Sequence, residues 1–335
     1  MLKVGIVGYG EWGPNMVRMF GHLPRVCVHA ICDNNPKQLV KAEQVKGSAS
    51  LLLNFSDMLK DIDAVVICSP PSTHYEFAKE ALKKGIHVLV EKPFVLKLEE
   101  ANELARLAST NKRVLMVGHI LAYHPAVAYL RKHIASGKAG KICYLYTQRL
   151  NLGRVRCNEN VIWSFGPHDI SAILYLLGKL PVEVTVQSES YLQKQVVDVA
   201  FITLKFPGNI LAHIHLSWLD PHKTRKMTIV GSKHMMVFDD MQSAQKISIF
   251  KRNMNSNNGT KHSDEAIRIK NGDAFAPSLP DLEPLKNECE HFLNCIRQNK
   301  PPLTGAENGT HVLKILMAAQ ESLKKNGKTV RIKWR

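Results

Sequence analysis

The sequence predicts an α/β protein with two domains. Over residues 1–120, short apolar runs alternate with segments of helical spacing, which is typical of a parallel sheet covered by helices on both faces. After residue 182 the chain reads as strand after strand, which predicts a second, α+β domain with a large and mostly antiparallel sheet. The chain has 335 residues, 45% of them hydrophobic, and is long enough for two separate cores.

Apolar runs mark the strands of the first domain, and we expect them at residues 4–7, 26–32, 64–68, 88–90 and 114–117. Helices are expected after Gly13 and at residues 36–46, 55–60, 75–84 and 98–109, with Ser72 or Thr73 capping the helix at 75–84. Two prolines, Pro70 and Pro71, stop the strand before that helix and force an extended loop.

The second domain, residues 121–335, begins with helices expected at 125–136 and 167–177, separated by a strand at 142–150 and an irregular stretch at 151–166. Further strands are expected at 182–188, 199–206, 210–218, 226–230 and 235–239. Residues 252–280 are polar and rich in Asn, Ser and Gly, which predicts a long loop. Helices at 283–298 and 306–325 complete the domain.

The first strand runs into three glycines, Gly8, Gly10 and Gly13, at the spacing G-x-G-x-x-G. The first permits a tight turn, the second lets the backbone approach a pyrophosphate, and the third lets the helix pack closely on the strand. The second strand ends at Asp33, twenty positions after Gly13 (33 − 13), where a carboxylate can accept both ribose hydroxyls of an adenosine. The sequence therefore predicts a Rossmann domain that binds NAD in preference to NADP; the alternative is the same fold with an empty loop.

Composition and charge bear on which partners, membrane segments and metals to expect. The net charge is +16, but the lysines and arginines are spread along the chain without a nucleic-acid-binding motif, so we expect a basic surface that attracts a small anionic substrate and no nucleic-acid partner. No apolar run approaches the roughly 20 residues of a membrane span, and no signal peptide precedes the first strand, so we expect a cytoplasmic protein without a membrane partner. The seven cysteines are scattered, and His213 and His215 have no evident third ligand, so we expect no metal.

Several stretches together resemble the glucose–fructose oxidoreductase and inositol dehydrogenase family (Gfo/Idh/MocA). They are Glu91-Lys92-Pro93, Ser69-Pro70-Pro71 with His74, and His168-Asp169. A branch of sugar-nucleotide 3-dehydrogenases carries stretches like residues 8–15, 118–125, 149–154 and 163–169. The resemblance covers nearly the whole chain and implies an NAD-dependent dehydrogenase acting on a CH–OH group, assembled as a homodimer or homotetramer.

Motif and resemblance together assign the cofactor-binding residues, which are Gly8, Tyr9, Gly10, Glu11, Trp12, Gly13, Asp33, Ser69, Pro70, His74, Glu91 and Lys92. Oxidising an alcohol also needs a base for the hydroxyl proton and a donor for the developing alkoxide. Lys92 suits the second role, since it ends a strand at the carboxyl edge of the sheet, and His168 suits the first. Many relatives carry an aspartate four residues before this histidine, where this chain has Ser164.

Candidate substrate-binding residues are Tyr123, His124, Asn151, Arg154, Arg156, Trp163 and His168. Arginines suit a diphosphate, because the planar guanidinium donates two parallel hydrogen bonds. The branch resemblance implies a UDP-sugar, with oxidation of UDP-N-acetylglucosamine at C3 before an aminotransferase step in cell-envelope amino-sugar biosynthesis. The alternatives are its C6 carboxylate analogue UDP-N-acetylglucosaminuronate, another sugar or an inositol, or an NAD-binding sensor without turnover.

Overall fold

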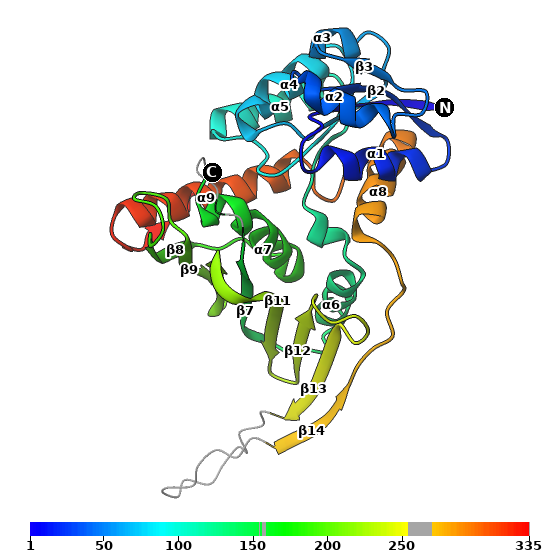
Figure 1. Ribbon diagram of the computed structural model, residues 1–335. Helices are drawn as coiled ribbons and strands as arrows, with labels where there is room; N and C mark the ends of the chain where they lie inside the picture. Colours follow the sequence, from blue (N-terminus) through cyan, green and yellow to red (C-terminus); the bar gives the residue numbers. More distant parts are fainter. Residues whose placement is uncertain (154, 156–158, 254–269, 335) are drawn as a thin grey trace, which may run out of the picture. The chain divides into compact units, whose positions relative to one another are not determined.

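A computed structural model describes residues 1–153, 155, 159–253 and 270–334 (Figure 1). The chain forms two compact units: the first comprises residues 1–123 and 282–314, and the second comprises 124–281 and 315–335. The N-terminal part of the first unit thus ends at residue 123, three residues after the predicted boundary at 120. The first unit also includes the segment 282–314, which the sequence prediction placed in the second domain.

The first unit is built on a parallel sheet with the strand order β3-β2-β1-β4-β5-β6. Its strands are β1 (Leu2–Val7), β2 (Val26–Cys32), β3 (Ser50–Leu52), β4 (Ala64–Ile67), β5 (His87–Val90) and β6 (Leu115–Val117). The central strands β1 and β4 are buried over residues 4–7 and 64–67, and Ile6 and Val66 have no exposed surface. The strand order reverses between β1 and β4, and ligands of such sheets bind at this point, beyond the carboxyl ends of the strands.

The helices of this unit are α1 (Gly13–His22), α2 (Pro36–Glu43), α3 (Phe55–Met58), α4 (Pro71–Lys83), α5 (Leu98–Thr110), the 3-10 turn η1 (Ile120–Tyr123) and α8 (Pro284–Gln298). Helix α9 (Ala306–Lys324) begins here and ends in the second unit. Figure 1 shows α8 beside α1, and it packs against both α1 and η1. Cys289 of α8 touches Met16 (Sγ–Sδ 3.9 Å), and Arg18 pairs with Glu283 (2.6 Å). These contacts explain why the returning segment belongs to the first unit.

Two local predictions for this unit were wrong. Helix α4 begins at Pro71, so Ser72 and Thr73 lie in its first turn and do not cap it. Proline is favoured at this position because the first helical N–H has no partner within the helix. Strand β3 was not predicted, since three residues are too few to show an alternating pattern.

The second unit is built on a sheet with the order β14-β13-β12-β11-β7-β10-β9-β8-β15, in which only β10 and β7 pair in parallel among the described residues. Its strands are β7 (Ile142–Leu152), β8 (Glu183–Glu189), β9 (Val199–Phe206), β10 (Ile210–Ser217), β11 (Leu219–Gly231), β12 (His234–Asp239), β13 (Ile247–Asn253), β14 (Lys270–Phe275) and β15 (Val330–Arg331). Helix α6 (Pro125–Ala135) packs on β12, and α7 (Val161–Leu177) packs on β7, β9 and β10. The prediction of a mostly antiparallel sheet is confirmed.

Helix α7 begins six residues earlier than predicted, at Val161 instead of Pro167. Asn160 caps it, because its side-chain oxygen accepts hydrogen bonds from the amides of Ile162 and Trp163 (both 3.1 Å). Pro167 therefore lies inside the helix. The residue before it is Gly166, which has no Cβ to clash with the proline ring, so the helical backbone can continue.

The loop predicted at 252–280 contains the end of one strand and the whole of another. Strand β13 runs to Asn253, and β14 occupies residues 270–275. The intervening residues 254–269 lie outside the described part of the chain. The polar composition of this stretch hid the strands, because exposed edge strands carry little apolar alternation.

Candidate functional site

The predicted cofactor loop joins β1 to α1, and two of its glycines are required by close backbone contacts. Gly8 has a positive φ of 92°, and a Cβ there would lie 2.5 Å from the amide nitrogen of Ser69. A Cβ at Gly13 would lie 2.2 Å from the carbonyl oxygen of Gly8. A Cβ at Gly10, in contrast, would meet no described atom within 4 Å. The loop is thus tight on its protein side and open at Gly10, as a dinucleotide-binding loop needs to be.

Asp33 follows β2 directly, and its carboxylate is held by the backbone. One oxygen accepts from the amide of Tyr9 (2.7 Å) and the other from the amide of Asn35 (2.8 Å). The first of these bonds ties the end of β2 to the glycine loop. Because each carboxylate oxygen can accept a further hydrogen bond, the group can still take the ribose hydroxyls of a bound adenosine.

The remaining loop residues divide by exposure. Tyr9 is buried, and burial raises the pKa of its hydroxyl. Glu11 is exposed, and Trp12 is 36% exposed. The indole of Trp12 hydrogen-bonds to the carboxylate of Glu91, which lowers the pKa of Glu91. This contact joins the glycine loop to the end of β5.

His74 braces two further predicted loops against each other. It is buried, with Nδ1 2.9 Å from the carbonyl oxygen of Pro93 and Nε2 2.9 Å from that of Ser69. Burial lowers the pKa of His74, although these carbonyls raise it. Pro70 precedes the first residue of α4 and belongs to the same loop as Ser69. With both ring nitrogens against carbonyls, His74 supports the cofactor loops, and its predicted direct contact with NAD stays a prediction.

Glu91 and Lys92 follow β5 at the carboxyl edge of the sheet, and both are partly buried. The Lys92 amide donates to a Glu91 carboxylate oxygen (3.2 Å). Burial raises the pKa of Glu91 to about 7, against the lowering effect of the Lys92 charge. The peptide bond between Lys92 and Pro93 is cis. The first unit therefore presents a lysine and a carboxyl group that titrates near neutral pH at the carboxyl edge of its sheet. They follow β5, whereas Asp33 follows β2, on the other side of the point where the strand order reverses.

In the second unit, His168 lies in the second turn of α7 and not at the helix start that the sequence predicted. The next residue, Asp169, is buried and accepts a hydrogen bond from Nε of Arg149 on β7 (2.5 Å). Ser164, one turn before His168, is also buried. The charge beside His168 is therefore carried by an Asp169–Arg149 ion pair. Lys92 belongs to the first unit and His168 to the second.

Arg225 is the residue that sequence reasoning missed. It lies on β11 opposite Arg149 and donates to the carbonyl of Leu150 (2.8 Å) and to the side-chain oxygen of Asn151 (3.5 Å). Its guanidinium stacks over the ring of Phe165 (5.1 Å). Burial and, to a smaller extent, the neighbouring charge of Arg149 together lower the pKa of Arg225 to about 10. Only the pairing of β11 with β7 brings the two arginines together, so no local motif signals them.

Tyr123 does not have the free hydroxyl expected of a substrate contact. It is buried in the first unit, where its hydroxyl hydrogen-bonds to that of Thr304 (2.8 Å) and its carbonyl accepts from Asn287 (3.0 Å). Burial also raises the pKa of the Tyr123 hydroxyl. The structure thus favours a packing role over the predicted role in binding.

His124 and Trp163 are likewise engaged within the second unit. His124 accepts from the first turn of α6 through Nδ1 (3.0 Å) and contacts Asp240 through Nε2 (3.2 Å). Trp163 donates from its indole to Gln320 (3.2 Å). The predicted residues Arg154 and Arg156 lie outside the described residues. Of the other predicted substrate residues that the structure describes, Asn151 accepts a hydrogen bond from Arg225, and His168 lies on α7.

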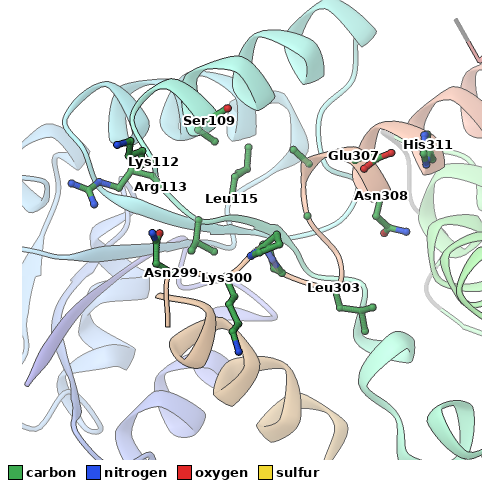
Figure 2. A pocket seen from close by; sticks show the side chains of 16 residues that line it. Ser109, Lys112, Arg113, Leu115, Asn299, Lys300, Leu303, Glu307, Asn308 and His311 are labelled. Atoms are coloured by element: carbon green, nitrogen blue, oxygen red, sulfur yellow. The ribbon is translucent and has the colours of Figure 1, made fainter. Parts of the chain in front are cut away.

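A hollow of about 600 Å³ lies elsewhere on the first unit, beside the edge strand β6 (Figure 2). Figure 2 shows Lys112 and Arg113 on one side, Asn299 and Lys300 on the other, and Glu307 at the start of α9. None of the site residues predicted from the sequence and described by the structure lines it. It is therefore separate from the glycine loop and the Glu91–Lys92 turn.

Within the described residues, no group of three His, Cys, Asp or Glu side chains could hold a metal ion. In the same part of the chain, no helix has the length and apolar character needed to cross a membrane. What the first unit does offer is a set of groups that fits a dinucleotide: the N-terminus of α1, the open space above Gly10, and the acceptor Asp33.

Comparison with known proteins agrees with this geometry. Residues 2–119 match the family model described as an oxidoreductase family with an NAD-binding Rossmann fold, and residues 127–237 match that of the GFO/IDH/MocA C-terminal domain. The UDP-N-acetylglucosamine 3-dehydrogenase of Acidithiobacillus ferrooxidans is 28% identical over 316 residues, covering 93% of this chain and 94% of that protein. A solved structure of the enzyme from that organism superposes with a TM-score of 0.83 at 25% identity, covering 97% of this chain and 98% of the other. A 2,7-anhydro-N-acetylneuraminate hydratase of Mediterraneibacter gnavus is 22% identical over 325 residues, covering 92% of this chain and 86% of that protein.

Proposed function

The chain belongs to the GFO/IDH/MocA family of NAD-binding oxidoreductases, and from this we propose that it oxidises the C3 hydroxyl of UDP-N-acetylglucosamine to a ketone. The observation that carries the proposal is the similarity to a UDP-N-acetylglucosamine 3-dehydrogenase over almost the full length of both chains. The product would be a 3-keto sugar nucleotide. Its chemistry suits a following aminotransferase in cell-envelope amino-sugar biosynthesis.

The first unit supplies the cofactor site. The amides at the start of α1 would hold the pyrophosphate above Gly10, and Asp33 would accept the adenosine ribose hydroxyls. The nicotinamide end would then extend across the switch point toward β4 and β5, where Glu91 and Lys92 lie. When bound there, NAD accepts the hydride from the substrate carbon.

Lys92 and His168 are the proposed catalytic residues. The ammonium of Lys92 would stabilise negative charge on the reacting oxygen, since its position beyond β5 puts it at the ligand-binding edge of the sheet. His168 would accept the hydroxyl proton. The neighbouring Asp169 cannot share that proton freely, because Arg149 occupies one of its oxygens.

The substrate diphosphate calls for cations, and the second unit provides two on adjacent strands. Arg149 and Arg225 face each other in the β7–β11 register, and Asp169 is ion-paired with Arg149. The guanidinium of Arg225 donates to oxygens of Leu150 and Asn151, which are uncharged, and so keeps positive charge for an anionic ligand. The chain-wide excess of basic residues has the same sign and would draw a sugar nucleotide toward the protein.

The test is to incubate the protein with NAD and each of UDP-N-acetylglucosamine, UDP-N-acetylglucosaminuronate and a free inositol. NADH formation is followed by absorbance, and the ketone is trapped with a 3-aminotransferase and glutamate and identified by mass spectrometry. NADH and a 3-amino product from the neutral sugar nucleotide are expected. Turnover of the uronate alone would move the assignment to that substrate. Conversion of a sugar without accumulation of NADH would contradict a net oxidation.

We also propose that the second unit forms the contact of a homodimer or homotetramer. Helix α7 covers one face of the large sheet, whereas Tyr144, Phe201 and Leu211 are 45%, 39% and 48% exposed. Phe201 stacks on His213 and His215, whose alternation along β10 puts them on one face of the sheet. Large apolar side chains gathered on a sheet face are typical of an interface between subunits.

A further inference from the structure

Helix α8 carries a buried carboxyl group that neither the cofactor motif nor the catalytic residues explain. Glu288 has no exposed surface, and neither of its carboxylate oxygens has a hydrogen-bond partner among the described residues. His119, just after β6, is 1% exposed, and its two ring nitrogens also lack a described partner. Buried polar groups are nearly always hydrogen-bonded, so groups like these call for an explanation.

The packing of α8 brings Glu288 to the cofactor end of the first unit. Figure 1 shows α8 beside α1, the helix that starts at the glycine loop, and α8 also packs on η1. On the next residue of α8, Cys289 touches Met16 of α1. Just before η1, Gly118 lies against Glu91, since a Cβ on Gly118 would be 3.1 Å from the Glu91 carboxyl oxygens. Glu288 and Glu91 are close enough for the negative charge of Glu91 to act on the Glu288 carboxyl group.

The charges around the two carboxyl groups are unequal. The charge of Lys92, the Lys92 amide and the Trp12 indole all favour an ionised Glu91. Burial raises the pKa of Glu288 well above its ordinary value, and the negative charge of Glu91 raises it further. The other titratable groups that interact with this pair are Cys68, Cys289, Tyr123 and, through Lys92, His119. Burial keeps all four of these neutral near pH 7, so none of them compensates a charge on Glu288.

A buried carboxylate without a partner is costly, whereas a neutral carboxylic acid has one O–H group to donate. Glu288 is therefore neutral near pH 7, and Glu91, whose charge acts on it, can accept a hydrogen bond from its O–H group. The Glu91 carboxyl titrates in the same range, with a pKa of about 7. The pair consequently holds between one and two protons under ordinary conditions.

We propose that Glu288 is a positioning residue of the cofactor site, which donates a hydrogen bond to Glu91 through one water, so that Glu91 changes its charge with the state of NAD. The cationic ring of NAD⁺ at the end of β5 favours the ionised Glu91, and its binding releases a proton to solvent. The neutral ring of NADH removes this attraction, and Glu91 takes a proton back. The proposal rests on NAD binding and is independent of which sugar is oxidised.

The experiment is calorimetric titration with NAD⁺ and with NADH, without any sugar, in buffers of different ionisation enthalpy at pH 7. The dependence of the heat on the buffer gives the number of protons released per cofactor bound. With a Glu91 pKa of about 7, the wild type should release about half a proton with NAD⁺ and fewer with NADH. Its NAD⁺ affinity should rise about tenfold between pH 6 and pH 8, following the ionised fraction of Glu91.

Three variants separate the roles. Glu91→Gln should abolish the proton release, which identifies its source. Glu288→Gln keeps a donor and a neutral side chain, so it should behave like the wild type. Glu288→Leu removes the donor, which should bring the release close to one proton and weaken NAD⁺ binding about fivefold, with little effect on NADH. Glu290→Leu, two residues along α8 with a side chain that is 43% exposed, is the matched control and should change neither.

Glu288→Leu with wild-type proton release and a wild-type ratio of NAD⁺ to NADH affinity would overturn the proposal, leaving Glu288 a packing residue. If that variant fails to fold, the proton release and the pH dependence of NAD⁺ affinity measured on the wild type still test the proposal. A proton release of zero, or an NAD⁺ affinity that does not change between pH 6 and pH 8, would equally overturn it. A failed assignment of the sugar substrate leaves all of these readings unaffected, because no sugar is present.

Discussion

Alanine at Gly13 and at Gly10 should separate the folding of the cofactor loop from its function. A Cβ at Gly13 would lie 2.2 Å from the Gly8 carbonyl oxygen, whereas real Cβ atoms stay at least 3.0 Å away, so the backbone must move by at least 0.8 Å (3.0 − 2.2). Neither atom belongs to a flexible side chain that could give way. Overpacking of this kind costs about 1–3 kcal/mol, which lowers the melting temperature of a unit of this size by about 2–12 °C.

Gly10→Ala is the matched comparison. Its Cβ would meet nothing described within 4 Å and its φ is not in the left-handed region, so the melting temperature should stay within about 2 °C of the wild type. The added methyl instead fills the space through which the pyrophosphate approaches the backbone, and NAD affinity should fall by roughly tenfold or more. Thermal unfolding without cofactor measures the first effect, and a fluorescence titration with NAD measures the second. An unchanged melting temperature for Gly13→Ala, or wild-type NAD binding by Gly10→Ala, would refute the reading of this loop.

Three further predictions concern the cofactor, the catalytic pair and the assembly. Asp33→Ala should bring kcat/KM for NAD and NADP to within about tenfold of each other, because it removes the acceptor of the ribose hydroxyls and the charge that repels a 2′-phosphate; a wild type that uses NADP equally well would contradict this. Lys92→Met and His168→Asn should each lower kcat by roughly 10²–10⁴-fold while NAD still binds, as titration can verify, and near-normal turnover in either would remove that residue from the mechanism. Phe201→Glu should shift the protein toward monomer in sedimentation because it buries charge in the expected interface, and an unchanged distribution would place the contact elsewhere.

The parts of the site that sequence predicted well are those fixed by neighbours along the chain. The spacing of Gly8, Gly10 and Gly13, with Asp33 after the next strand, reports local geometry: a turn, a close helix and a strand end. The structure shows the contacts that make Gly8 and Gly13 necessary. The cofactor followed from these residues, and the family followed from the short motifs at 69–74, 91–93 and 168–169. The comparisons bear out both.

The parts that sequence missed depend on pairing between distant segments. Arg225 meets Arg149 only through the register of β11 on β7, and Glu288 reaches Glu91 only because α8 returns to α1. The start of α7 was misjudged for a different reason. A proline usually marks a helix start, but Asn160 supplies a cap seven residues before Pro167. Gly166 removes the clash that would have stopped the helix at that proline.

The return of residues 282–314 has a practical consequence for anyone dividing the protein. The chain passes between the two units three times, after residues 123, 281 and 314. A fragment ending at Tyr123 would expose the apolar surface of α1 around Met16, and the Tyr123 hydroxyl would lose Thr304. The nucleotide-binding half therefore cannot be isolated by truncation. It would have to be rebuilt from two pieces, with a short linker joining Tyr123 to Leu282 and a stop introduced within α9.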